Sequence, residues 1–132
     1  MKIVINKCYG GYELSYEAAM YYAKLKGIKL YAYVDTAREI KPYDKKDKMR
    51  GLCIHYATKK VATSVDLNKY YFSTNNIERT DADLVKTVEK LKKKANGPCA
   101  DLTVIEIPDG TEYTIEEYDG VEHIAEKHNT WF

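Results

Sequence analysis

The segment from Lys2 to Gly27 has the sequence KIVINKCYGGYELSYEAAMYYAKLKG, and it sets the fold of the chain. Its apolar residues at 3–5 are consecutive, which is typical of a strand buried on both faces. The pair Gly10 and Gly11 then marks a loop. Ser15 has the chemistry of a helix N-cap, and Gly27 stands where a helix ends. We therefore predict strand, glycine loop and helix in this order.

The rest of the chain continues the alternation of strands and helices. Period-two patterns predict strands over 30–36, 69–73, 100–108 and 113–118, and one long strand or a hairpin over 51–65. The polar stretch 37–50 is expected to be a long loop. A second helix is predicted from Thr80, capped by Thr80 and Asp83 and ended by the pair at 96–97. Residues 121–128 are predicted to form a short terminal helix.

Two turn signals follow the second helix. The pair at 109–110 is predicted to join strands 100–108 and 113–118 as partners, and the pair at 119–120 marks another turn. With 132 residues, the chain is expected to form one domain spanning 1–132. The predicted fold class is α+β, with a mixed or antiparallel sheet and two main helices.

Composition excludes several classes of protein. Lys plus Arg number 21 and Asp plus Glu number 20, so the net charge of +1 disfavours a partner that is a nucleic acid polymer. No apolar run has the length of a membrane span, and the start is too polar for a secretory signal. Three cysteines without close pairing indicate reduced thiols, and we expect a cytoplasmic protein.

Tyrosine is unusually frequent, with 13 Tyr against 2 Phe and 1 Trp. Such an excess suits interfaces and ligand pockets, because tyrosine combines a large rigid surface with a polar tip. The alternative is that tyrosine replaces phenylalanine in a small core. The terminal Trp131 is expected to pack on this chain or on a partner chain.

Catalytic and metal-binding patterns are weak. Cys8 could pair with a histidine as a nucleophile, but no signature surrounds it, and an inert buried thiol is the stronger interpretation. His123 and His128 are five residues apart and so lie on different faces, which disfavours a metal site. The acidic residues over 112–126 lack an apolar neighbourhood that would shift their pKa values. We expect neither a metal nor another cofactor.

Three arginines could contact an anion. Arg79 directly precedes the predicted second helix, so its guanidinium and the positive helix end could converge on one anion. Arg38 and Arg50 flank the polar loop, which could close over a ligand. For each of the three, a solvated surface position is an equally good interpretation.

Five blocks of the chain resemble a known family. They are KIVINKCYGGY at 2–12, RTDADLV at 79–85, ANG at 95–97, ADLTVIEIPDG at 100–110 and IEEYDGVEHIAEKH at 115–128. These blocks are similar to a family of small phage and prophage proteins, the Thoeris anti-defence sponges. The blocks cover both ends of the chain, and residues 28–73 match no part of that family. Asn129 stands where relatives commonly carry Arg.

The resemblance implies a phage protein that binds a cyclic ADP-ribose isomer, or another cyclic nucleotide, and holds it uncleaved; the chain is then not an enzyme. A chain of this size has little room for a deep pocket, so we expect a homo-oligomer with the ligand between chains. From residue chemistry and block position, the ligand-binding residues fall into two sets. Those expected to contact phosphate or ribose are Arg38, Arg50, Arg79 and Asn96. Those expected to contact the base are Tyr9, Tyr118, His123 and Asp119.

Two other functions stay open. A small nucleotide-directed hydrolase would use Cys8, His123 or the acidic cluster and would turn over excess substrate. A protein that blocks a host enzyme by direct contact would use its tyrosine-rich surface and its aromatic tail.

Overall fold

The terminal parts of the chain meet in the first sheet of the structure, a computed structural model that describes residues 1–35, 39–44 and 53–127. Strand β1 (Lys2–Asn6) pairs antiparallel with β6 (Leu102–Glu106). Four of the five β1 residues are buried, which confirms the predicted doubly covered strand. The prediction that β6 pairs with the strand after it is wrong, because β1 already occupies that edge and six residues separate β6 from the next strand.

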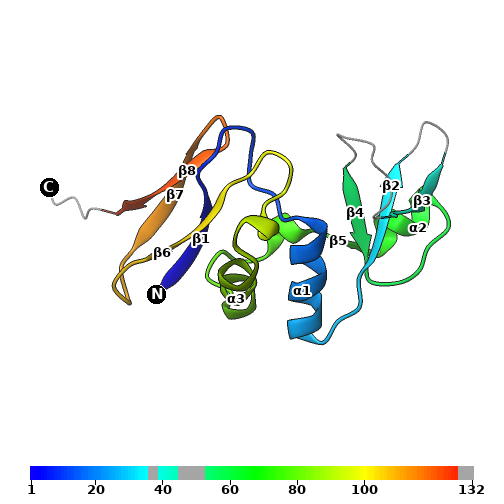
Figure 1. The fold of residues 1–132 in the computed structure, drawn as a ribbon, viewed down its shortest axis with the longest axis horizontal. Coiled ribbons are helices and arrows are strands. Elements are labelled where there is room, and N and C mark those ends of the chain that lie inside the picture. The colour runs from blue at the N-terminus through cyan, green and yellow to red at the C-terminus, as the bar shows by residue number, and fades with distance from the viewer. Residues whose placement is uncertain (36–38, 45–52, 128–132) are drawn as a thin grey trace, which may run out of the picture.

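Helix α1 (Tyr16–Lys26) begins and ends as predicted. The Ser15 hydroxyl accepts a hydrogen bond from the Ala18 N–H at 3.1 Å, and Gly27 adopts a left-handed φ of 73°. Small side chains at 18, 19 and 23 let the helix pack on two sides at once. One side faces the β1–β6 pair and the other faces the middle sheet, so α1 lies between two layers of strands (Figure 1).

Helix α3 (Ala82–Leu91) packs an apolar stripe against α1 and β1. Its N-cap is Asp81, whose carboxylate accepts from the N–H groups of Asp83 and Leu84 at 2.9 and 3.1 Å. The prediction that Thr80 caps this helix is therefore wrong by one residue, because a carboxylate satisfies two N–H groups at once. The helix ends before the predicted pair at 96–97, and a 3-10 turn, η2 (Lys92–Ala95), fills the interval.

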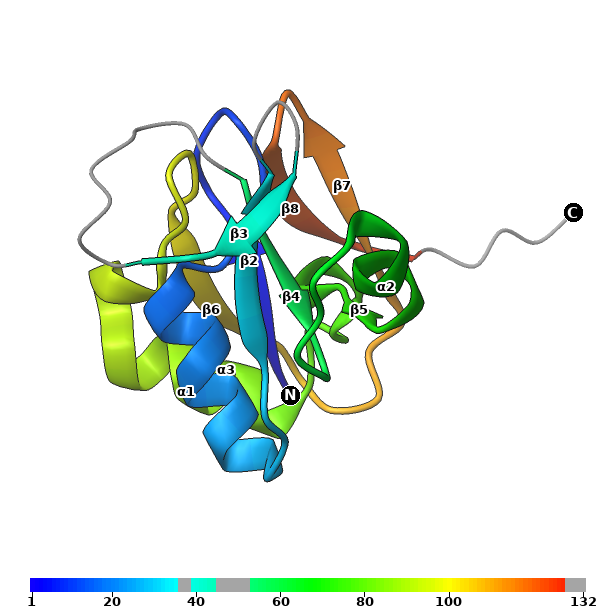
Figure 2. The same cartoon turned by 90° about the vertical axis from the view of Figure 1, so that its right-hand side faces the viewer.

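The middle of the chain forms a second sheet in the order β3-β2-β4-β5, antiparallel throughout. Its strands are β2 (Tyr31–Asp35), β3 (Ile40–Pro42), β4 (Ile54–Ala57) and β5 (Tyr71–Phe72). Helix α2 (Ser64–Lys69) packs on the face opposite to α1 (Figure 2), and a 3-10 turn, η1 (Thr74–Asn76), leads onward. Of the strand or hairpin predicted over 51–65, the described residues form only β4, which ends at Ala57; the chain then bends, and Thr63 caps α2. Strand β3 lies within the predicted loop.

A separate hairpin covers the other face of the β1–β6 pair. Strands β7 (Tyr113–Tyr118) and β8 (Val121–Glu126) are joined by a two-residue turn with positive φ at Asp119 and Gly120, the type that hairpins favour. The predicted terminal helix over 121–128 is wrong in its described part, which is β8. Glu122 faces inward on this strand, so a buried carboxylate hides the alternation that sequence patterns rely on.

The α+β class with two main helices and antiparallel sheets is thus confirmed, and the strands are divided among three sheets. Within the described residues, no helix has the length and apolar character needed to cross a membrane.

Candidate functional site

Arg79, the residue expected to bind phosphate, is engaged within the protein. Its guanidinium forms a two-pronged ion pair with Glu122 at 2.6 and 2.9 Å and donates to the Val4 carbonyl at 3.2 Å. Glu122 is 7% exposed and also accepts from the Asn6 N–H at 2.8 Å. A carboxylate held by three donors offsets the guanidinium charge. Arg79 therefore fastens the hairpin to β1.

Asn6 extends this contact to the hairpin turn. Its fully buried amide donates to the carbonyls of Cys8 and Gly120 at 2.8 and 2.7 Å. The Gly10 N–H donates to the Asp119 carbonyl at 3.0 Å. A Cβ at Gly120 would collide with the Gly11 backbone, so only glycine allows the turn to sit this close. The glycine loop and the hairpin turn are one rigid junction.

Tyr12 lies under the same junction. The Arg79 guanidinium carbon is 3.5 Å from the centroid of the Tyr12 ring, so the two groups stack. Among the described residues, the Tyr12 hydroxyl is buried with no hydrogen-bond partner. Burial raises the pKa of Tyr12 to about 12, and the Arg79 charge opposes that rise. Tyr12 is thus a packing residue that stays neutral at physiological pH.

Three of the residues expected to contact a base gather at the tip of this junction. Tyr9 and Tyr118 are 68% and 73% exposed, and Asp119 forms the turn beside them. His123 lies along the exposed face of the hairpin, where its Nε2 is 3.0 Å from a Glu116 oxygen. The tip therefore presents exposed aromatic surface.

The remaining predicted residues have other positions. The Asn96 side-chain oxygen accepts from the Leu102 N–H at 2.8 Å and so organises the start of β6. Arg38 and Arg50 lie outside the described residues, as do Asn129 and Trp131.

A cavity rich in aromatic side chains lies elsewhere, along β2, and we call it the tyrosine groove. It has a volume of about 470 Å³ and is lined by Tyr16, Met20, Leu30, Tyr31, Ala32, Tyr33, Pro42, Tyr43, Lys60 and Val61. The rings of Tyr16 and Tyr43 are 4.9 Å apart between centroids. The Tyr43 N–H donates to the Ala32 carbonyl at 2.9 Å, which fixes Tyr43 beyond the end of β3. Four tyrosines from three segments therefore border this opening, with Tyr16 on the α1 side of β2 and Tyr31 and Tyr33 on the α2 side.

The floor and one wall of the groove are fixed. Tyr33 is 5% exposed, and its hydroxyl accepts a hydrogen bond from the Val61 N–H at 2.9 Å. Sequence patterns place Tyr31 and Tyr33 on one face of a strand, and that alternation is the signal for this site. Such patterns do not show that α1 and the segment after β4 complete the groove. The groove was therefore not predicted from the sequence.

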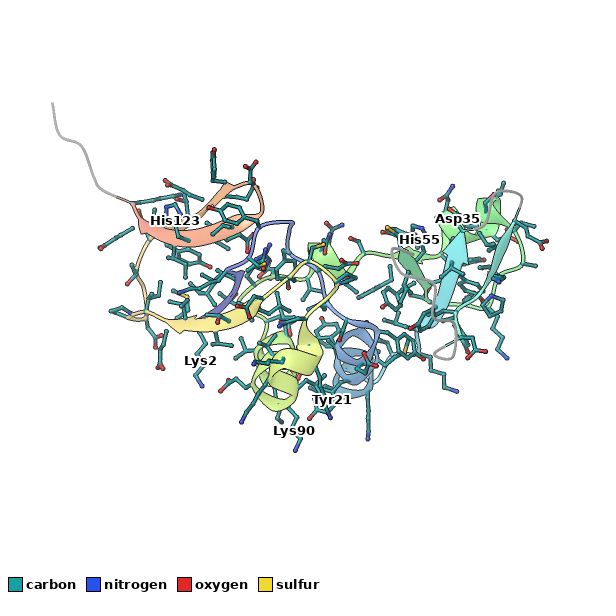
Figure 3. The ribbon with its side chains drawn as sticks, turned by 45° about the horizontal axis from the view of Figure 1, so that its top comes forward. Lys2, Tyr21, Asp35, His55, Lys90 and His123 are labelled. Atoms are coloured by element: carbon teal, nitrogen blue, oxygen red, sulfur yellow. The ribbon has the colours of Figure 1, made fainter. Side chains whose placement is uncertain are left out.

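Histidines and carboxylates outside the groove have the residue types of a catalytic or metal site. Asp35, His55 and Ser64 line a cavity of about 310 Å³. The His55 Nε2 faces Asp35 at 3.8 Å, too far for a hydrogen bond, and a nucleophile–histidine–carboxylate triad requires one ring nitrogen for each partner. His123 lies at the opposite end of the molecule from His55 (Figure 3), so these two histidines form no common site. Within residues 1–35, 39–44 and 53–127, no cluster of three metal-ligating side chains occurs.

Comparison with protein-family models, curated proteins and solved structures finds no significant match to this chain.

Proposed function

We propose that this protein binds a cyclic nucleotide and holds it without cleaving it, with the tyrosine groove as the binding site. The observation that carries the proposal is the convergence of Tyr16, Tyr31, Tyr33 and Tyr43 on one cavity of about 470 Å³. Small-molecule sites are commonly cavities of roughly 300–1,000 Å³ lined by aromatic side chains with a few polar groups. A nucleobase is a planar ring of the kind that such side chains stack against.

The energetic requirement supports a site with more than one kind of contact. A protein that sequesters a signal needs a dissociation constant near nanomolar, which corresponds to about 12 kcal/mol. Stacking on aromatic rings contributes about 1–3 kcal/mol per base. The aromatic contacts therefore supply a minor share, and the charged part of the ligand must supply much of the rest.

The resemblance of the chain ends supports the same class of ligand. It suggests a cyclic ADP-ribose isomer as the ligand and the cytoplasm of an infected bacterium as the setting. No residue that lines the groove lies in the five matched blocks, so the resemblance and the groove are separate arguments. Because the groove opens to solvent, a second copy of the chain that closes it would increase the buried surface of the ligand.

The test is a thermal-shift and calorimetric panel of cyclic ADP-ribose isomers and cyclic mono- and dinucleotides. A tight ligand raises the melting temperature by mass action. Tyr31→Ala is expected to weaken binding by about 5- to 150-fold, while Tyr31→Phe retains it. Tyr118→Ala, which removes the same side chain from the exposed hairpin tip, is the matched control and is expected to leave affinity unchanged.

Recovery of the ligand distinguishes binding from chemistry. Protein loaded with the ligand and then heated is expected to release it with unchanged mass and chromatographic retention. Release of a hydrolysed product, absence of binding to every cyclic nucleotide, or equal losses in Tyr31→Ala and Tyr118→Ala would contradict the proposal.

One observation favours a second candidate function, the direct blocking of a host enzyme. Tyr9 and Tyr118 project from a rigid junction with most of their surfaces exposed, and such tyrosines are common at the centres of protein interfaces. A host protein that co-purifies with wild type and is lost with Tyr9→Ala and Tyr118→Ala would support this function. Retention of that protein in both variants would remove the candidate.

A further inference from the structure

The segment between β4 and α2 carries Lys59 and Lys60, and α2 ends at a third lysine, Lys69. Lys60 lines the groove itself, and its Nζ lies 5.9 Å from the centroid of the Tyr31 ring. Lys59 and Lys69 both approach Tyr70, with Nζ 5.0 and 5.5 Å from the ring centroid. Tyr31 and Tyr70 pack against the same hydrophobic cluster, so Lys59, Lys60 and Lys69 all lie over rings that border one cluster.

None of these three ammonium groups forms a salt bridge with a carboxylate of the described residues. The salt bridges of the described part of the chain involve other lysines, for example Lys2 with Glu89 and Lys26 with Asp81. Lys59, Lys60 and Lys69 instead lie over aromatic rings, which stabilise a cation without neutralising it. The surface around these rings therefore keeps a net positive potential at the edge of an aromatic cavity.

The backbone beneath these lysines is fixed. The Thr58 N–H donates to the Tyr70 carbonyl at 3.0 Å, and the Val61 N–H donates to the Tyr33 hydroxyl at 2.9 Å. Thr63 then caps α2 through its hydroxyl, which accepts from the Asp66 N–H at 3.2 Å. The segment is held on both sides of Lys59 and Lys60, so a ligand would meet these two cations on a fixed backbone.

We infer that Lys59, Lys60 and Lys69 form the anion-recognising end of the tyrosine groove and bind the phosphate groups of a nucleotide whose base occupies the aromatic part. This inference rests on the proposed function for the identity of the ligand. The chemical class is a nucleotide with at least two phosphate charges, because three neighbouring ammonium groups match a pyrophosphate better than a single phosphate. The site thus selects the anionic part by charge and the base by stacking.

The experiment uses calorimetry with adenosine, AMP, ADP and inorganic pyrophosphate as probes. Affinity is expected to rise in the order adenosine, AMP, ADP, and to fall with added salt for AMP, ADP and pyrophosphate but not for adenosine. The double variant Lys59→Gln/Lys60→Gln is expected to weaken ADP and pyrophosphate about 10- to 100-fold and to leave adenosine unchanged. Lys93→Gln/Lys94→Gln, an exposed lysine pair with the same charge change, is the matched control.

The outcomes separate this inference from the proposed function. If Tyr31→Ala no longer binds adenosine and ADP, while Lys59→Gln/Lys60→Gln and Lys93→Gln/Lys94→Gln bind ADP equally well, the proposed groove is supported and the anion site is overturned. If pyrophosphate binds and depends on Lys59 and Lys60 but no base-containing probe binds more tightly, the anion site stands and the nucleotide function fails. If pyrophosphate and ADP bind equally to wild type and to Lys59→Gln/Lys60→Gln, the inference is wrong.

Discussion

Replacing Arg79 by methionine should unfold the protein at a much lower temperature. Methionine keeps apolar contact with the Tyr12 ring but removes three donors, two of them to Glu122, which is 7% exposed. Breaking a buried ion pair from one side costs about 3–5 kcal/mol, because the other charge stays buried and unpaired. For 132 residues the unfolding entropy is about 0.28 kcal/mol/K, so the melting temperature should fall by about 11–18 °C.

A thermal melt followed by circular dichroism measures this change, and two variants control it. Lys86→Met removes an exposed cation from α3 and should shift the melting temperature by no more than about 2 °C. In Arg79→Met/Glu122→Gln the amide oxygen still accepts from Asn6 and no charge is buried, so more than half of the loss should be recovered. The reasoning is refuted if Arg79→Met melts within about 4 °C of wild type, or if the double variant is no more stable than Arg79→Met.

Three further predictions concern stability. Gly120→Ala should lower the free energy of unfolding by at least about 2 kcal/mol and reduce hydrogen-exchange protection in β7 and β8, because the new Cβ meets the Gly11 backbone. The control Gly110→Ala, where the space is open, should lower it by about 1 kcal/mol. Burial opposes a low pKa at Asp81, but the Lys26 ammonium and two helix N–H groups outweigh it and lower the pKa. The stability that the Asp81 carboxylate contributes above about pH 4 is therefore lost as the pH falls through the pKa of the folded state. Asp81→Asn should show a smaller drop in urea midpoint from pH 6 to pH 3 than wild type, and an equal drop would contradict this. Tyr12→Phe should leave stability unchanged or raise it by up to about 1 kcal/mol, because the buried hydroxyl has no partner among the described residues. Burial raises the pKa of Tyr12 to about 12, so wild type should lose stability relative to this variant as the pH rises above about 10. A variant clearly less stable than wild type at pH 7 would contradict this.

Local chemistry explains which parts of the fold were predictable. Ser15 and Gly27 bound α1 because capping depends on neighbours within one helical turn. The turn at 119–120 is equally local. Pairing of β1 with β6 is different, because a register across 100 residues depends on which edge is free, and no single segment records that.

Glu122 shows how a buried polar residue misleads a pattern. It occupies an inward position of β8, so Val121, Ile124 and Ala125 fall at spacings that mimic a helix. Only its partner Arg79, 43 positions earlier, explains why a carboxylate is tolerated there. The same ion pair engages the Arg79 guanidinium, whose contact with a ligand stays a prediction.

The arrangement of the cores separates binding from folding. The cluster that contains Val4, Leu84 and Leu102 joins the chain ends, whereas Tyr31, Lys60 and the rest of the groove belong to the middle sheet or its neighbours. Helix α1 contributes opposite faces to the two sides, with Ala18 in the first cluster and Ala19 in the second. A substitution at the rim of the groove therefore leaves the core between the chain ends intact. A substitution of a binding residue in the groove should therefore weaken ligand binding without a comparable loss of stability. A substitution of Arg79 should lower stability without a comparable direct loss of ligand affinity.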